Sequence, residues 1–443
     1  MCKQEKSTQG YKCIQSVGEY INAIQEIIKK EREKDSDFDK KYEVYFRGHI
    51  DKDFFLIPSL LRNKPGNIDL VGQACKEIVD NEHIAFRSIV AKHPSEFAEC
   101  TSAIEYLVKM QHYKLKTRLL DITSNALVAL YFACTTESGD VNDKLGEVIV
   151  FKLPKRIIKH YDSDTISAVA NIARCKPSDF IFSLRGEKNQ LSDFVNGLID
   201  PDCKRNKPTY NNYQSALLSK SNGSNSTQKQ GMSPYNSNEI PETKSFAWSH
   251  LHGIPQTEIQ NLTNFYRAKI QEVDTSEDSL VTLEYKNQFN GELDYLHHQI
   301  KAEKSYYKLL IEPYDLGKIW AVNTKLENPR IINQSGSFLL FGLGIKEIDG
   351  SNQLIYSKEF HPQIPDTWIA GRIGVGSYKA HTQEETEETK NQIRKRKKKN
   401  KKKKANIVRQ LSMLGIDHSF IFPDLETAAK EINKQLLSSK TDK

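Results

Sequence analysis

Apolar residues recur along residues 14–33 at the spacing of one helix face, with charged residues between them. The apolar positions from Ile14 to Ile28 lie three or four residues apart, which is the repeat of an amphipathic helix. The pattern changes at Tyr42–Phe46, a short apolar run rich in aromatic residues that predicts a strand ending at Arg47 and Gly48.

The chain continues with helical and extended patterns in turn. Asp69–Lys116 reads as mostly helical, with a break near His93 and Pro94, and Arg118 opens a short extended segment. Thr123, Ser124 and Asn125 are typical N-cap residues for the apolar helix predicted at Ala126–Phe132. Further strands are predicted at Gly146–Leu153, Tyr306–Glu312 and Ile319–Val322, with a strand, a turn at Ser335 and Gly336, and a second strand over Pro329–Gly344. Further helices are predicted at Asp164–Arg174, Ile407–Leu414 and Leu425–Leu437.

These elements predict an α+β or α/β fold with a central mixed sheet flanked by helices. We expect a single large domain over residues 14–437, with core blocks 42–200, 246–380 and 405–437. Two polar segments interrupt it and are predicted to be disordered insertions. Residues 204–244 are rich in Ser and Asn, and residues 381–404 pass from an acidic patch into a basic run.

The basic run accounts for the net charge of the chain. Arg394–Lys404 contains ten basic residues in eleven, so removing it turns the net charge of +7 into 7 − 10 = −3. The body is therefore not a basic nucleic-acid-binding fold. We favour a solvated loop for Arg394–Lys404, and the alternatives are weak contact with nucleic acid or a tether to an anionic surface.

Composition narrows the class of protein further. With 38% hydrophobic and 27% charged residues in 443, the chain is not wholly disordered. No apolar run approaches the ~20 residues of a membrane helix, and the first residues lack the apolar core of a secretory signal. The 7 cysteines form no CxxC pair, which indicates reduced thiols and a cytoplasmic location.

Several short motifs together resemble a known bacterial family, the FRG domain. They are Phe46-Arg47-Gly48, Pro58-Ser59-Leu60-Leu61-Arg62, Gln111-His112-Tyr113, Thr117-Arg118-Leu119-Leu120-Asp121, the helix from Asn125 to Ala133, Asn333–Phe338, Leu414–Ile416 and Phe422–Leu425. The central signature of the family has a glycine, a proline and a tryptophan where this chain has Lys114, Lys116 and Ile122. The resemblance implies a setting of bacterial stress or phage defence, including toxin-like proteins, and leaves the activity open.

A weaker resemblance to ADP-ribosyltransferases suggests a chemistry. Those enzymes place an Arg at the end of a first strand, a Ser/Thr motif on a later strand before a helix, and a Glu on a third element. Arg47, Thr123-Ser124 and Gln334 occur here in that order. The resemblance implies NAD as substrate, with Arg47, Arg118, Thr123 and Ser124 holding it.

The same resemblance assigns catalytic roles to Arg47, Gln334, His112 and Asp121. A carboxylate would stabilise the positive charge that develops on the ribose when the nicotinamide bond breaks. Gln334 carries no charge, so either it only positions the ribose, or another acid such as Asp121 replaces the Glu, or no transfer occurs. His112 is a candidate general base because its ordinary pKa lies near 7.

Each candidate residue also has a purely structural interpretation. Arg47 could brace the edge of the sheet, and Arg118 and Asp121, three positions apart, could pair with each other. His112 could cap a helix, Thr123 and Ser124 could cap the next one, and Gln334 could close a hairpin. A binding module of the same fold, recognising nucleic acid or a protein partner, is therefore the competing hypothesis. A two-metal nuclease is disfavoured because no acidic cluster is visible, and His297-His298 has no third ligand.

Overall fold

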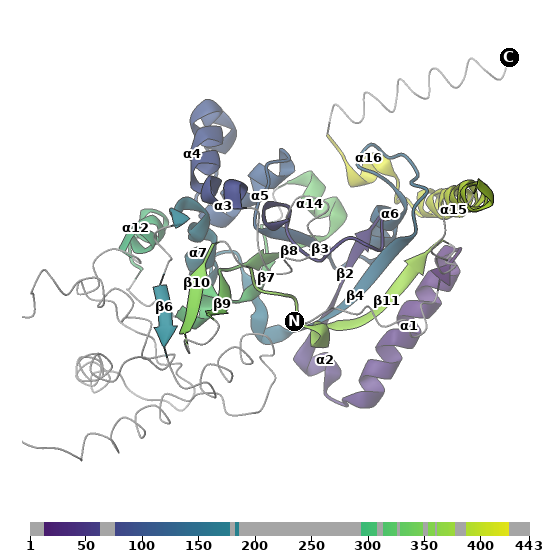
Figure 1. Cartoon of the computed structure of the whole chain (residues 1–443), viewed down its shortest axis with the longest axis horizontal. Coiled ribbons are helices and arrows are strands. Elements are labelled where there is room, and N and C mark those ends of the chain that lie inside the picture. Colours follow the sequence, from purple (N-terminus) through teal and green to yellow (C-terminus); the bar gives the residue numbers. More distant parts are fainter. Residues whose placement is uncertain are drawn as a thin grey trace, which may run out of the picture.

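An eight-stranded mixed β-sheet forms the centre of the computed structural model (Figure 1). The structure describes residues 13–62, 76–177, 182–185, 294–307, 313–325, 328–348, 353–358, 361–376 and 387–424. The strands in sheet order are β1 (Cys13–Ile14), β11 (Ile369–Val375), β4 (Gly146–Pro154), β2 (Tyr42–His49), β3 (Leu119–Thr123), β8 (Gly336–Phe341), β7 (Ile319–Asn323) and β5 (Ile158–His160). The β1–β11 and β5–β7 pairs are parallel and the other neighbours are antiparallel, which confirms the predicted mixed sheet.

A smaller antiparallel sheet lies beside the large one. Its strands are β6 (Phe182–Arg185), β10 (Gln353–Ser357) and β9 (Gly344–Ile348), and β10 is the central strand. Because β9 follows β8 after a two-residue connection, the chain passes directly from the large sheet into the small one.

Helices cover both faces of the large sheet, and β4 shows why. Alternate residues of a strand point to opposite faces, so Val148 and Val150 join one buried cluster and Ile149 and Phe151 join the other. The first cluster contains side chains of α1 (Val17–Lys34), α6 (Ala126–Cys134) and α15 (Glu387–Met413). The second contains side chains of α4 (Glu82–Lys92), α5 (Ala103–His112), α7 (Asp164–Asn171) and α12 (Asp294–Glu303). The shorter helices are α2 (Phe38–Lys41), α3 (Lys76–Asp80), α13 (Pro313–Leu316), α14 (Pro329–Gln334) and α16 (His418–Ile421).

Gly48 brings α6 close to the sheet. A Cβ atom at this position would lie 1.9 Å from the main-chain oxygen of Ala129 and 2.8 Å from the nitrogen of Ala133. No side chain fits at that separation, so the glycine that follows Arg47 is required by the packing of α6 on β2.

Local signals predicted the start of α6 correctly, because Asn125 caps this helix by accepting from the main-chain nitrogen of Leu127. Helix α1 begins three residues later than predicted, after Ser16, which accepts from the main-chain nitrogen of Glu19. The strands predicted at Tyr42–Phe46, Gly146–Leu153 and Ile319–Val322 are confirmed, as is the end of a helix near Leu414.

The strand predicted at the start of Pro329–Gly344 is wrong, because Pro329–Gln334 forms helix α14. Asn328 caps this helix by accepting from the main-chain nitrogen of Arg330, and Pro329 occupies its first turn, where a missing N–H costs nothing. Ser335 then ends the helix in the left-handed region, with φ of 46° and ψ of 47°, before β8 begins. The predicted strand at 306–312 is not formed at Tyr306 and Tyr307, and its remainder lies outside the described residues.

The solvated loop predicted for Arg394–Lys404 is also wrong, because the whole run is part of helix α15. Lysine and arginine are good helix formers, and the following turns bury Ile407 and Leu411 completely. Packing of this second half holds the helix in place, so the basic half is helical in spite of its charge. The insertion at 204–244 and the helix predicted at 425–437 lie outside the described residues. Among the described helices, none is both long enough and apolar enough to cross a membrane.

Candidate functional site

Two neighbouring strands and one helix end carry the residues that the resemblance singled out. Arg47 lies on β2, Thr123 ends β3, and Gln334 ends α14, two residues before β8 begins. Thr123 pairs with Phe46 on one side and with Gly336 on the other, so it lies between the other two. The Thr123 hydroxyl donates to the main-chain oxygen of Gln334 at 2.6 Å. Segments far apart in the sequence therefore meet at one place in the sheet.

Arg47 spans an opening between β2 and β3. Among the described residues these strands share one pair, Phe46 with Thr123, whereas β2 pairs with β4 along its whole length. The Arg47 guanidinium, 14% exposed, donates to the main-chain oxygen of Asp121, and its Nη1 lies 3.6 Å from the Asp121 carboxylate. Its Nε donates to Nε2 of the buried His49 at 3.0 Å, which fixes the plane of the guanidinium.

Asp121 is held in place but remains open to solvent. Its side chain is 61% exposed, and one carboxylate oxygen accepts from Nε2 of Gln111 at 2.6 Å. Gln111 is oriented in turn by Thr117, whose hydroxyl donates to its Oε1. An ordered and accessible carboxylate beside a guanidinium is a suitable partner for a cationic reaction centre.

Two further arginines lie within electrostatic reach of Asp121. Arg62 follows a short 3-10 helix at Ser59–Leu61. The main-chain N–H of Leu60 in this helix donates to the main-chain oxygen of Thr117, two residues before β3. Arg330 lies on α14, with its guanidinium carbon 4.3 Å from the ring centre of Phe422. Neither forms an ion pair within the part of the chain that the structure describes.

The charges of this group act on one another. Burial lowers the pKa of Arg47 to about 10. The negative charge of Asp121 opposes this shift, and the positive charge of Arg62 adds to it. Desolvation also lowers the pKa of Arg62 and of Arg330, and Asp121 again opposes the change. Asp121 acts on all three guanidinium groups, and Glu137 and Asp424 act on Arg330 as well. Arg47 and Arg62 share Asp121 as their acidic neighbour, and this local excess of positive charge is the condition for binding an anion.

His112 borders the same group of charges. It is half-buried at the last position of α5, and burial, followed by the charge of Arg330, lowers its pKa below the usual range, while Asp424 opposes the change. His112 is therefore neutral at pH 7 and can accept a proton.

We expect the substitution Arg330→Gln to raise the pKa of His112, because it removes the nearest positive charge acting on that ring. The ring proton resonances of His112, followed by NMR as the pH changes, measure the effect. Arg32→Gln, a change in an exposed ion pair with Asp39, is the control and should leave the titration of His112 unchanged. An unaltered His112 titration in the Arg330 variant would remove His112 from the site.

Thr123, Ser124 and Gln334 are engaged differently from their expected roles. The Thr123 hydroxyl is used within the main chain, because it also accepts from the nitrogen of Asn125 at 2.9 Å. The Gln334 amide donates to the main-chain oxygen of Ile421 at 2.9 Å, which fastens α14 to the segment after α15. Ser124 is exposed at the end of β3, and its main-chain nitrogen donates to the oxygen of Ser335 at 3.2 Å.

Arg118 lies apart from this site, and the predicted pairing of Arg118 with Asp121 is wrong. Its guanidinium is buried and forms a two-point ion pair with Glu82, while Nη1 donates to the main-chain oxygen of Phe341 at 2.9 Å. Lys358, also buried, lies 2.8 Å from the same Glu82 carboxylate. Arg118 is thus part of an internal ion network and cannot hold a cofactor beside Arg47.

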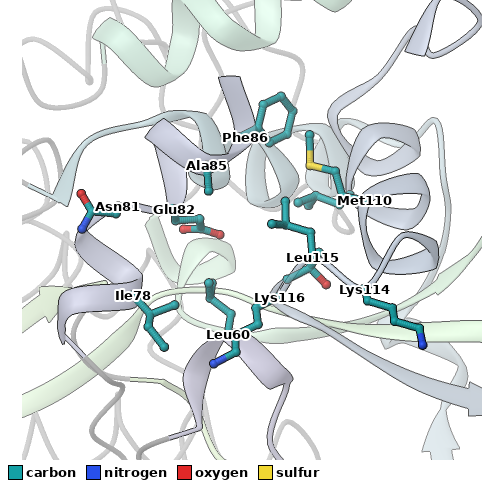
Figure 2. Close-up of a pocket in the computed structure, with 12 residues that line it drawn as sticks. Leu60, Ile78, Asn81, Glu82, Ala85, Phe86, Met110, Lys114, Leu115 and Lys116 are labelled. Atoms are coloured by element: carbon teal, nitrogen blue, oxygen red, sulfur yellow. The ribbon is translucent and has the colours of Figure 1, made fainter. Parts of the chain in front are cut away.

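A cavity of about 280 Å³ lies between α3, α4, α5 and the loop before β3 (Figure 2). Figure 2 shows Glu82 among apolar side chains such as Leu60, Phe86 and Met110. The Glu82 carboxylate is already paired with Arg118 and Lys358, and none of the predicted site residues lines the cavity. We therefore take the arginine group around Asp121, and not this cavity, as the candidate site.

Sequence reasoning missed Arg62, Gln111, His49 and Arg330 as site residues. Arg62 and Gln111 belong to motifs that were recognised, so their place in the motifs was a usable signal. Arg330 had no usable signal, because it lies in a segment predicted as a strand.

The described residues offer no metal site. His297 is buried, and burial lowers its pKa to about 4. No group of three potential metal ligands exists within the described ranges.

Comparison with known proteins supports one part of the resemblance. A family model described as the FRG domain matches residues 42–141, from the start of β2 to just beyond α6. That range includes Arg47, Arg62, Gln111, His112 and Asp121. No curated protein matches the chain. No solved structure matches it either.

Proposed function

Starting from the FRG domain at residues 42–141, we propose that this protein is an ADP-ribosyltransferase-like enzyme that uses NAD in bacterial stress or phage defence. One observation carries the proposal. Arg47 on β2 and the Thr123-Ser124 turn at the end of β3 lie beside Gln334, the last residue of α14, and Asp121 faces Arg47 at the opening between β2 and β3. That arrangement brings together a guanidinium that can bind phosphate and a carboxylate.

The arginines would bind the pyrophosphate of NAD. A guanidinium donates two parallel hydrogen bonds to a phosphate, and Arg47 is already oriented for this by His49. Arg62 and Arg330, which both act electrostatically on Asp121, would add positive charge. The exposed hydroxyl of Ser124, at the end of β3, would contact a ribose.

Asp121 would supply the negative charge that Gln334 lacks. When the bond between the nicotinamide nitrogen and ribose C1′ breaks, its electron pair leaves with the nicotinamide and C1′ becomes cationic. The Asp121 carboxylate would stabilise that cation until an acceptor nucleophile forms the new bond to C1′. The acceptor loses a proton in that step, and the neutral His112 would take it. Gln334 would act as a positioning residue through α14.

The experiment compares the full chain with Asp121→Asn on NAD labelled in its adenylate part, in the presence of a cell lysate. We expect the unchanged protein to consume NAD and label an acceptor. The rate of the Asp121→Asn variant should be at least about 100-fold lower, because the asparagine side chain carries no negative charge. Asp53→Asn, an exposed carboxylate paired with Lys52, is the matched control and should keep full activity.

Thermal unfolding of the three proteins separates loss of chemistry from loss of fold. If the unchanged protein neither consumes NAD nor transfers label, the transferase proposal fails, and the binding module, for nucleic acid or a protein partner, becomes the better description. Full activity of a folded Asp121→Asn variant would instead remove Asp121 from the catalytic role.

A further inference from the structure

Helix α15 is anchored to the body by one stripe of its second half. Gln410 also accepts the main-chain N–H of Val17 at 2.9 Å, and the helix packs against α6 and α1 (Figure 1). Lys404 donates from Nζ to the main-chain oxygen of Ile50 at 3.3 Å. The buried residues of the stripe are three or four positions apart, namely Asn400, Lys404, Ile407 and Leu411.

The body covers less of the helix before Asn400. Lys397 lies seven residues, about two turns, before Lys404 and so belongs to the same stripe, yet it is exposed while Lys404 is buried. From Lys399 back to Arg394, each side chain that the structure describes is exposed. The exposed basic residues are Arg394, Lys395, Lys397, Lys398, Lys399, Lys401 and Lys402.

No ion pair among the described side chains neutralises the charge of this stretch. None of its exposed basic residues forms an ion pair within the described part of the chain. Other surface lysines do, as Lys29 pairs with Glu33 and Lys40 with Asp37. Like charges one turn apart on a helix destabilise it, so a polyanion would relieve this repulsion as well as bind.

The spacing of the charges fits a nucleic acid. A helix rises about 1.5 Å per residue, so Arg394–Lys403 places roughly one cation every 1.7 Å along its axis. Duplex DNA carries one negative charge per about 1.7 Å of its own axis. A membrane-bound helix needs an apolar face to enter the lipid, and no apolar residue occurs in Arg394–Lys403.

We propose that the exposed basic side of α15, over residues 394–403, binds the phosphate backbone of nucleic acid without sequence preference. A rigid cationic helix keeps its charges at fixed spacing, so the entropy cost of ordering a flexible arm is avoided. The proposal goes beyond the NAD site and does not depend on it.

The test measures binding of the full chain to a fluorescently labelled duplex of 20 base pairs over a range of salt concentrations. The variant replaces four outward lysines by glutamine, which is also a good helix former: Lys395, Lys398, Lys399 and Lys402. We expect affinity at 0.1 M salt to fall by about tenfold or more, and the slope of log K against log salt to become shallower by about 3 to 4. The control replaces four exposed lysines elsewhere: Lys29, Lys34, Lys40 and Lys114.

Each outcome decides the proposal once circular dichroism shows that both variants keep their helix content. Loss of affinity confined to the α15 variant supports it. Equal loss in both variants would mean that net charge alone binds DNA, and the proposal would fail. It would also fail if the unchanged protein did not bind the duplex at 0.05 M salt, or if vesicles with 30% phosphatidylserine displaced the duplex from it.

Discussion

The substitution Glu82→Gln should lower the free energy of unfolding by about 3 to 5 kcal/mol, because it leaves two buried cations without their counter-charge. Arg118 bonds both carboxylate oxygens of Glu82, and Lys358 lies 2.8 Å from one of them. The amide of glutamine fits the space but cannot balance either charge. Urea denaturation of the full chain, fitted for midpoint and slope, measures the change.

The same network predicts how stability depends on acid. Burial would raise the pKa of Glu82, but the charges of Arg118 and Lys358 lower it to about 2. Because the folded pKa lies below the ordinary value, the contribution of Glu82 is complete above about pH 4.5 and is lost as the pH falls toward 2. Glu82→Gln should therefore flatten the stability profile in that range.

Glu33→Gln is the matched control, because Glu33 is 62% exposed and pairs with Lys29 on the surface of α1 at 3.9 Å. Exposed pairs of this kind contribute about 0.5 kcal/mol or less. If Glu82→Gln were no more destabilising than Glu33→Gln, the network would not stabilise the fold, and the burial of three charges would need another explanation.

The ion network also shows where sequence reasoning reached its limit. Arg118 and Asp121 are three positions apart, so a local pair was the natural expectation. The ion-pair partner of Arg118 is Glu82, which lies 36 residues before it in the chain. Lys358 binds the same carboxylate. Nothing in the local pattern around Glu82 or Lys358 marks them as buried charges. Pairings of this kind are set by the tertiary fold and are not encoded in sequence spacing.

Patterns that depend on neighbours in the chain were more informative. The strand at Tyr42–Phe46 and the cap at Asn125 are local features, and both are confirmed. The run at 394–404 failed for the opposite reason: its own composition suggests a solvated loop, but its helical state depends on Ile407 and Leu411 packing on another part of the fold. Arg47 and Thr123 lie on adjacent strands, whereas Gln334 and Arg330 lie on α14, a helix that the sequence pattern did not predict.

The Arg47→Lys variant should bind NAD about 10 to 100 times more weakly than the unchanged protein, even though its charge is preserved. The Arg47 guanidinium uses Nε on His49 and Nη1 on the main chain of Asp121, so it is held in one plane and keeps Nη2 as a further donor. A lysine cannot make both contacts and still present two parallel donors to a phosphate. Losing one charge-assisted hydrogen bond of about 1.5 to 3 kcal/mol corresponds to that range of affinity.

Isothermal titration of NAD into the full chain measures the change, and Arg32→Lys, in an exposed pair with Asp39 outside the opening, is the control. The variant His49→Leu isolates the positioning role. It removes the acceptor for Nε of Arg47 but leaves the guanidinium in place, so affinity should fall by a smaller factor while the protein still binds. NAD affinity equal to that of the unchanged protein in a folded Arg47→Lys variant would place the phosphates elsewhere, because no fixed guanidinium would then be needed at the junction of β2 and β3.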